Sequence, residues 1–265
     1  DINNGQSYDS CYILITKGRG LGQYRKVVAA DKEKREITID TPWDIQPGPG
    51  SRFVLTSLIV GDLWYNNSSY HTHNGLLLYG NCVDCVVAGN REVDGGGSYM
   101  RSFIQRPSET TAQVVPSYFN RIADNEFLGV SKITEGNSIR IDAETHEPTD
   151  ASIFCYIVYG IDIKNNVMDD EGRPLRINKD TWGEPGWPGR GIQILGFTRD
   201  NLAGKKNYKG VIVEKNNVKM NAPCMEVYDI LGGSSGYGMA VYDNDFESPE
   251  ESIIDNDKVI TYIQD

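Results

Sequence analysis

The chain is poor in cysteine, tryptophan and histidine and has no long apolar run, which argues against several common classes of protein. It holds 5 cysteines, 4 tryptophans and 3 histidines in 265 residues. No apolar run reaches the roughly 18 residues that a membrane-spanning helix needs. No window carries a long apolar stripe at helical spacing either. We therefore expect neither a helical bundle nor a membrane span.

Basic residues are also scarce. The chain has 26 Lys and Arg against 37 Asp and Glu, which gives a formal net charge of −11, and its basic residues form no run. Proteins that bind duplexes neutralise phosphates with Lys and Arg. Nucleic acid is therefore excluded as the expected partner, and the excess of acid suits solubility.

The cysteines are odd in number and scattered, unlike the dense and even sets of small disulfide-bonded secreted proteins. "CVDC" at 82–85 resembles half of a zinc site, but no second pair follows. "YHTHNG" at 70–75 could bind a metal through its two histidines, but it reads as a surface turn. We predict no metal centre and interpret Cys82 and Cys85 as buried structural thiols.

Glycine and tyrosine are abundant, with 28 and 15 copies, which is typical of strands joined by turns. Five short segments share a pattern: a β-branched or apolar residue, two spacers, an Asn and soon another apolar residue. Asn tolerates the left-handed backbone of a sharp corner, and its side-chain amide can hydrogen-bond to a copy of itself in the next repeat. We predict stacked corners at Asn90, Asn125, Asn166, Asn216 and Asn244.

The repeat also predicts which side chains line the interior. These are the apolar residues three before the Asn (Ile122, Ile163, Val213, Val241) and two after it (Phe127, Met168, Val218, Phe246). The intervals between the Asn residues vary, as they do in solenoids whose repeats carry loop insertions.

This pattern resembles the right-handed, single-stranded parallel β-helix of the pectate-lyase-like superfamily, and we expect an all-β fold with coils over residues 61–265. An antiparallel β-sandwich is the alternative, although hairpin turns such as Asn-Gly are rare here. The resemblance implies a secreted or cell-surface protein, with a periplasmic location as a variant. It also implies a polysaccharide or oligosaccharide as partner. It does not indicate an oligomeric state.

Residues 1–60 form a separate module. Residues 12–57 read as strands joined by a Gly-rich turn, a charged turn and a Pro-Gly loop. "GRGLG" at 18–22 is followed by neither Lys-Ser/Thr nor a helix, so we interpret it as a turn and not as a phosphate loop. The module resembles a segment of secreted and phage-borne β-helix proteins, and we expect it to pack on the helix or to cap it.

Three segments alternate as strands with polar residues on one face. Residues 138–144 point Arg140, Asp142 and Glu144 outward; residues 174–178 point Arg176 and Asn178 outward; residues 224–229 point Glu226 and Tyr228 outward. Counted from the register Asn, Arg176 and Glu226 should be neighbours on adjacent coils.

Such a column would place two carboxylates about 5 to 10 Å apart, which suits glycoside hydrolysis. We predict Asp142, Glu144, Glu226, Arg140 and Arg176 as catalytic. The alternative is a solvated face of cross-strand ion pairs.

"TWGEPGWPGRG" at 181–191 adds two aromatic faces for sugar stacking. Together with Tyr228 and Asn178, we therefore predict Trp182 and Trp187 as substrate-binding residues. The alternative is a loop pinned by its Trp side chains. His146, just beyond the 138–144 strand, could serve as an acid or base.

Two other functions stay open. A polysaccharide lyase would use Arg140 or Arg176, with calcium held by Asp169, Asp170 and Glu171. These three residues are more typical of a solvated acidic turn, so we expect no cofactor. A non-catalytic carbohydrate-binding protein, adhesin or phage-fibre segment is the other alternative.

Overall fold

The computed structural model describes residues 11–72, 74–108, 111–130, 137–146, 155–171, 189–197, 206–229, 236–249, 251–256 and 258–264. These residues form strands β1 to β30, and none of them forms an α-helix.

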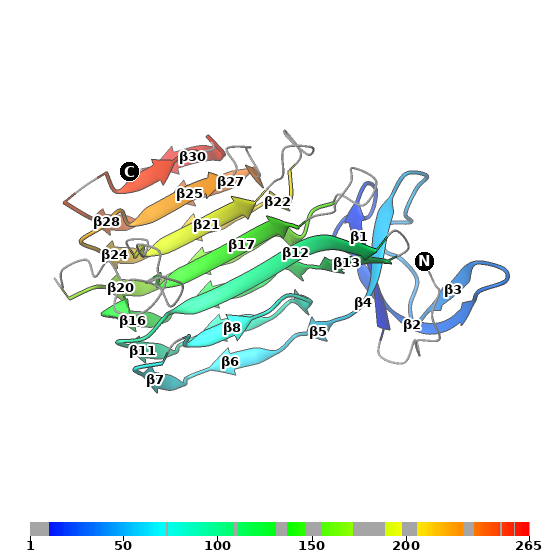
Figure 1. The fold of residues 1–265 in the computed structure, drawn as a ribbon, viewed down its shortest axis with the longest axis horizontal. Helices are drawn as coiled ribbons and strands as arrows, with labels where there is room; N and C mark the ends of the chain where they lie inside the picture. The colour runs from blue at the N-terminus through cyan, green and yellow to red at the C-terminus, as the bar shows by residue number, and fades with distance from the viewer. Residues whose placement is uncertain are drawn as a thin grey trace.

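From Ile59 onward the chain runs through four sheets of parallel strands in a constant order (Figure 1). Sheet I consists of β5 (Ile59–Val60), β9 (Cys82–Val83), β14 (Ser117–Tyr118), β18 (Val158–Tyr159), β22 (Tyr208–Lys209) and β26 (Gly236–Tyr237). Sheet II consists of β6 (Leu63–Tyr65), β10 (Val86–Ala88), β15 (Arg121–Ala123), β19 (Asp162–Lys164), β23 (Ile212–Glu214), β27 (Met239–Tyr242) and β30 (Ile260–Gln264).

Sheet III consists of β7 (Ser68–Tyr70), β11 (Arg91–Val93), β16 (Glu126–Leu128), β20 (Val167–Asp169), β24 (Asn217–Lys219) and β28 (Asp245–Glu247). Sheet IV consists of β8 (Leu76–Leu78), β12 (Ser98–Ser108), β17 (Ile139–Thr145), β21 (Ile192–Phe197), β25 (Met225–Asp229) and β29 (Ile253–Asp255). Strand β13 (Thr111–Val115) adds to β12 in the antiparallel sense.

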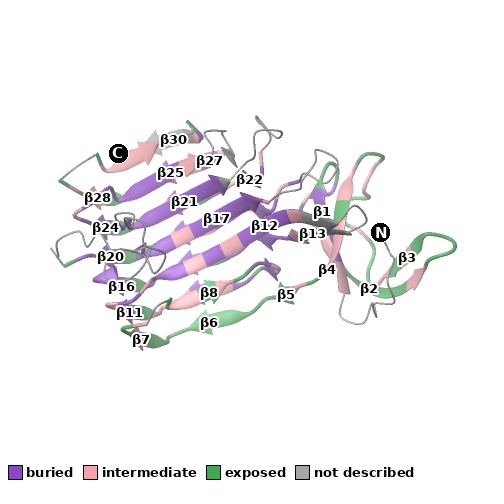
Figure 2. Ribbon diagram, viewed as in Figure 1, coloured by how far each residue is buried: buried purple, intermediate pink, exposed green. Residues whose placement is uncertain are grey.

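We call one passage through sheets I to IV a coil; the first is β5–β8 and the last is β26–β29. Neighbouring strands in all four sheets are parallel, apart from β13, so the antiparallel sandwich is wrong. The all-β arrangement of stacked parallel sheets is compatible with a β-helix. Its middle coils are the most buried, and β6 and β7 of the first coil are exposed (Figure 2).

The interior follows from strand alternation, which sends every second side chain inward. Seven of the eight predicted interior residues are buried, and the eighth, Phe246, is half-buried. They stack in register from coil to coil, as in Phe127, Met168 and Val218 on neighbouring strands. The core prediction is therefore confirmed.

The five predicted Asn residues form a continuous ladder of amides, and Asn67 adds a sixth rung that the sequence pattern missed. At each step the side-chain Nδ2 donates to the Oδ1 of the next Asn, at 2.9 Å between Asn166 and Asn216. The backbone N–H of Asn166 donates to the same oxygen at 3.0 Å. The predicted stacking is confirmed.

The predicted left-handed backbone of these Asn residues is wrong. The positive φ angle falls on the residue before each predicted Asn: Gly89, Asp124, Asn165, Lys215 and Asp243. The preceding residue turns the chain, and the Asn side chain turns inward to satisfy its neighbours.

The N-terminal module is a four-stranded antiparallel sheet of β1 (Cys11–Lys17), β2 (Tyr24–Asp31), β3 (Glu36–Ile39) and β4 (Arg52–Ser57), in the order β3-β2-β1-β4. Leu14 packs with Val83 and Tyr118 of sheet I, and the Tyr24 hydroxyl donates to Asp84 Oδ2 at 2.6 Å. The module therefore packs on the flank of the coils and does not cap an end (Figure 1).

Two details of the module refine the sequence analysis. Gly18, Gly20 and Gly22 of "GRGLG" have positive φ angles in the turn between β1 and β2. This is the glycine-dependent turn that the sequence predicts. The first strand of the coils, β5, already begins at Ile59, just before the expected boundary after residue 60.

Gly22 is expected to be critical for docking the module. A Cβ at this position would lie 2.5 Å from Phe119 Cζ. Overpacking and the positive φ together should make Gly22→Ala cost about 3 kcal/mol of unfolding free energy. Gly50→Ala is the matched control, because Gly50 has φ +87 but nothing within 4 Å of its Cβ. Urea unfolding of both variants checks this, and equal losses would contradict the packing argument.

Candidate active site on sheet IV

The candidate site lies on the outer face of sheet IV around β17. Ile139, Ile141 and Ala143 of this strand are buried in the core. Alternation therefore sends Arg140, Asp142 and Glu144 to the outer face, as the sequence predicts. Both acids are nevertheless buried, and Asp142 is 0% exposed.

Asp142 is held by one arginine and one tyrosine. Arg140 donates to its two oxygens from Nε at 2.8 Å and from Nη2 at 2.9 Å. The Tyr99 hydroxyl on β12 also donates to Oδ2, and the Arg140 guanidinium lies 5.0 Å from the centre of the Tyr99 ring. Burial raises the pKa of Asp142 to about 6, although Arg140 and Tyr99 act in the opposite direction.

The pKa of Glu144 is shifted in the opposite direction, downward. Its Oε2 lies 2.8 Å from Arg101 Nη2 and 2.8 Å from His146 Nε2. Burial acts to raise the pKa of Glu144, but these two hydrogen bonds and the charge of Arg101 outweigh it and lower the pKa to about 2. The two acids are two residues apart on one strand, and their pKa values are shifted in opposite directions. Burial favours the protonated form of Asp142, whereas Arg101 and His146 favour the ionised form of Glu144.

Glu226 belongs to a separate polar group on β25. It pairs with Arg190, at 3.3 Å from Nε, and accepts from Gln193 Nε2 at 3.0 Å. Gln193 stands between Arg140 and Glu226 in the strand register. Glu226 therefore shares a column with Arg140 but is two strands away from it.

In sheet IV, Glu226 stands between Gln193 of β21 and Ile254 of β29. The expected pairing of Arg176 with Glu226 stays a prediction. Arg176 itself, Asn178, Trp182 and Trp187 lie outside the described residues. Tyr228 faces outward in the column of Leu195 and Asp142, and burial raises its pKa to about 12.

Sequence reasoning missed four residues of these groups: Tyr99, Arg101, Arg190 and Gln193. A signal was present for the first two, because residues 98–103 place Tyr99 and Arg101 in alternate positions. Arg190 lies near the end of the Gly- and Pro-rich segment 181–191, and Gln193 lies just after it. Neither residue belongs to an alternating pattern in the sequence.

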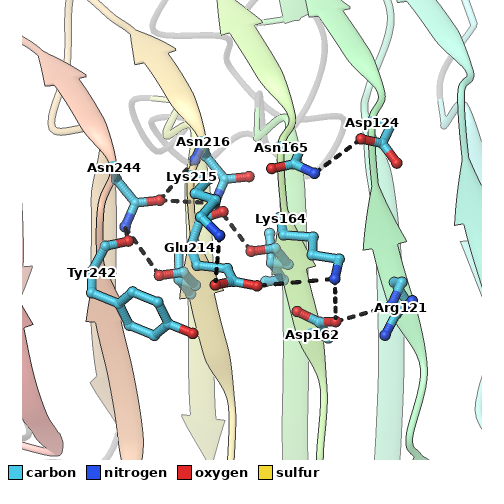
Figure 3. A network of polar contacts seen from close by, with 12 residues as sticks. Arg121, Asp124, Asp162, Lys164, Asn165, Glu214, Lys215, Asn216, Tyr242 and Asn244 are labelled. Atoms are coloured by element: carbon cyan, nitrogen blue, oxygen red, sulfur yellow. Dashed lines mark hydrogen bonds and ion pairs between the residues drawn. The ribbon is translucent and has the colours of Figure 1, made fainter.

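A second polar network lies on the outer face of sheet II (Figure 3). Arg121 pairs with Asp162 at 2.9 Å, and Lys164 lies 3.5 Å from Asp162 and 3.9 Å from Glu214. Arg121 is 50% exposed and its partner Asp162 is 22% exposed, so water reaches this pair. Partly exposed ion pairs contribute little to stability, and we interpret this face as cross-strand pairs.

In the acidic turn at 169–171, which was considered as a calcium site, carboxylate oxygens accept hydrogen bonds from backbone N–H groups. Asp169 Oδ1 accepts the Glu171 backbone N–H at 2.6 Å, and the buried Asp170 accepts from the Asn221 backbone. Within the described ranges no group of three or more His, Cys, Asp or Glu is placed to hold a metal ion. The described part of the chain contains no helix that is long and apolar enough to cross a membrane.

The charge of Glu144 predicts a pH dependence of stability. Its pKa is lowered on folding, so its contribution is complete above its ordinary pKa and is lost as the pH falls toward 2. The stability difference between the parent and Glu144→Gln should therefore shrink by about 2 kcal/mol between pH 6 and pH 2. This figure is reduced from the full effect of the pKa shift because solvent screens part of the interaction. Urea unfolding at both pH values measures it, and a constant difference would contradict the assigned pairing.

Comparison with known proteins gives no relative of this chain: no family model, no curated protein and no solved structure matches it. The stacked parallel sheets and the buried carboxylates of sheet IV are therefore the basis on which its function is inferred.

Proposed function

We propose that the chain is a right-handed, single-stranded parallel β-helix of the pectate-lyase-like type that acts outside the cell on a polysaccharide. We propose further that it is a glycoside hydrolase whose site is the Asp142–Glu144 pair. The observation that carries the proposal is the pair itself: two buried acids on the outer face of one strand, each with its own arginine. A glycosidase needs two carboxylates with opposite protonation preferences.

The environments of the two acids suggest their roles. Asp142, with its raised pKa, is the general acid that protonates the leaving oxygen. Glu144 remains ionised and stabilises the positive charge that develops on the sugar ring, or orients water. Residues two apart on a strand lie about 7 Å apart, which is within the range of inverting enzymes, so we expect inversion.

Access requires a movement, because Asp142 is 0% exposed. Tyr99 and Arg140 both hydrogen-bond to its carboxylate, and the Arg140 guanidinium lies over the Tyr99 ring. A bound glycan must displace at least one of them, and either can then hydrogen-bond to sugar hydroxyls. Tyr228 faces the same column and extends the surface available to the glycan.

The test is incubation with a broad panel of plant, algal and host polysaccharides, followed by assay of new reducing ends between pH 4 and pH 8. Because the acid must be protonated, the rate should fall roughly tenfold per pH unit above about pH 6. The proposal fails if no polysaccharide is cleaved, or if cleavage rises through pH 7 and pH 8. Binding without cleavage would favour a carbohydrate-binding module, adhesin or fibre segment.

A lyase is the second candidate, favoured by the contact of Arg140 with Tyr99. An arginine can neutralise a uronate carboxylate, and a tyrosine can transfer the proton removed from its α-carbon. Unsaturated product ends would assign this chemistry in place of hydrolysis.

A further inference from the structure

The corner between β9 and β10 carries two cysteines, Cys82 and Cys85, both buried inside the coil. Val83 and Asp84 lie between them, and Asp84 takes a φ of 56° and turns the chain sharply. The equivalent positions in the next coils are Ser117 with Asn120, and Val158 with Ile161. All of these residues are buried, so the two positions converge inside the corner in successive coils.

Asn120 fixes the geometry of the corner that carries both cysteines. Its Oδ1 accepts the Cys85 backbone N–H at 2.9 Å, and its Nδ2 donates to the Cys82 carbonyl at 3.0 Å. One amide therefore clamps both ends of the four-residue turn. The clamp holds the two cysteines in place without any covalent link.

Both thiols face carbonyls of the same corner. Cys82 Sγ donates to the Gly80 carbonyl at 3.1 Å, and Cys85 Sγ lies 3.6 Å from the Val83 carbonyl. The interaction between the two thiols lowers the pKa of Cys85 to about 7 and raises the pKa of Cys82. Cys85 is thus the nucleophile of the pair and Cys82 the resolving thiol. The other cysteines are engaged elsewhere: Cys155 with Thr16, and Cys224 with the Val218 carbonyl.

We propose that Cys82 and Cys85 are a disulfide site, which closes by exchange with a low-molecular-weight disulfide such as oxidised glutathione. The Cys85 thiolate attacks one glutathione sulfur, forms a mixed disulfide and releases one glutathione thiolate. Cys82 then loses its proton to solvent, attacks the Cys85 sulfur and expels the second glutathione thiolate. Two protein thiols are oxidised, and one small disulfide is reduced to two thiols.

The first coil controls access to this site. Cys85 Sγ lies 3.5 Å from the Ile59 carbonyl on β5, an edge strand of two residues. Ile59 and Val60 are both exposed. Opening of so short an edge strand is a low-energy local event, and it uncovers Cys85 without unfolding the coils.

The test is peptide mapping of the full chain after incubation with oxidised glutathione under native conditions, followed by alkylation with iodoacetamide and trypsin. The peptide of residues 53–91 contains Cys82 and Cys85 and no other cysteine. We expect it to lose the mass of two hydrogen atoms and to resist alkylation, whereas Cys11, Cys155 and Cys224 are alkylated after unfolding.

Two variants sharpen this result. In Cys82→Ser the proposed resolving thiol is missing, so Cys85 should stop at the glutathione mixed disulfide. Cys224→Ser is the control and should still close the Cys82–Cys85 bond. The proposal is overturned if peptide 53–91 is fully alkylated after both native oxidation and refolding in a glutathione redox buffer. It is equally overturned if Cys82 or Cys85 is found linked to a different cysteine.

Discussion

Replacement of Asn166 by alanine is expected to lower the free energy of unfolding by about 4 kcal/mol or more, the largest stability loss that we predict. Asn166 is 0% exposed. Its Oδ1 accepts the backbone N–H and the Nδ2 of Asn125 at 3.1 and 2.9 Å, and its Nδ2 donates to the Ile122 carbonyl at 3.0 Å. Alanine leaves these buried groups without partners, and each such group costs about 1–3 kcal/mol.

Asn67→Ala is the control for this ladder effect. Asn67 occupies the first rung, is exposed, and donates to Asn90 Oδ1 at 3.0 Å. Water can replace its hydrogen bonds, so we expect a loss of about 1 kcal/mol. Urea unfolding followed by circular dichroism measures both. Similar losses for the two variants would show that the amide ladder does not stabilise the middle coils.

Asp142→Asn is expected to lower the rate of polysaccharide cleavage at least about 100-fold, because the asparagine cannot donate the catalytic proton. It has nearly the same shape as aspartate and can still accept from Arg140 and Tyr99, so we expect the coils to stay folded. The rate is measured at pH 5 on the polysaccharide that the parent protein cleaves best, with the fold checked by circular dichroism.

Asp162→Asn is the matched control, because Asp162 pairs with Arg121 on sheet II and not on sheet IV (Figure 3). It should retain the parent rate within about twofold, since a partly exposed ion pair contributes little to stability. An Asp142→Asn protein that is folded and as active as the Asp162→Asn control would remove Asp142 from the mechanism.

The repeat could be predicted from the sequence because each Asn must meet the next one, whatever the length of the loops between them. The amide fixes the register, so the interior residues counted from it were placed correctly. Asn67 was missed because the strands around it carry exposed apolar side chains such as Leu63 and Tyr65, which blur the alternation.

The candidate site was only partly predictable. Residues 138–144 alternate between apolar and polar, and the structure brings Arg140, Asp142 and Glu144 to one face. The next strand of sheet IV is β21, where the outward-facing Leu195 is apolar and buried, so its sequence does not alternate. The segment at 174–178 does alternate, and for that reason it was the one predicted from the sequence.

Ion pairs that cross between strands cannot be derived from one strand's pattern. Arg101 stands opposite Asp142 in the register, yet it bonds to Glu144, two residues further along. Tyr99 stands opposite Arg140 and bonds to Asp142. This diagonal offset on β12 gives each acid its own partner, and it depends on side-chain reach that only the three-dimensional arrangement defines.

The measurement that tests the account most directly is cleavage of the polysaccharide panel in water enriched in heavy oxygen, with mass spectrometry of the products. Hydrolysis at the Asp142–Glu144 pair predicts one heavy oxygen atom at each new reducing end, and no such product from Asp142→Asn. Products with unsaturated ends and no heavy oxygen, or the absence of any product, would contradict it.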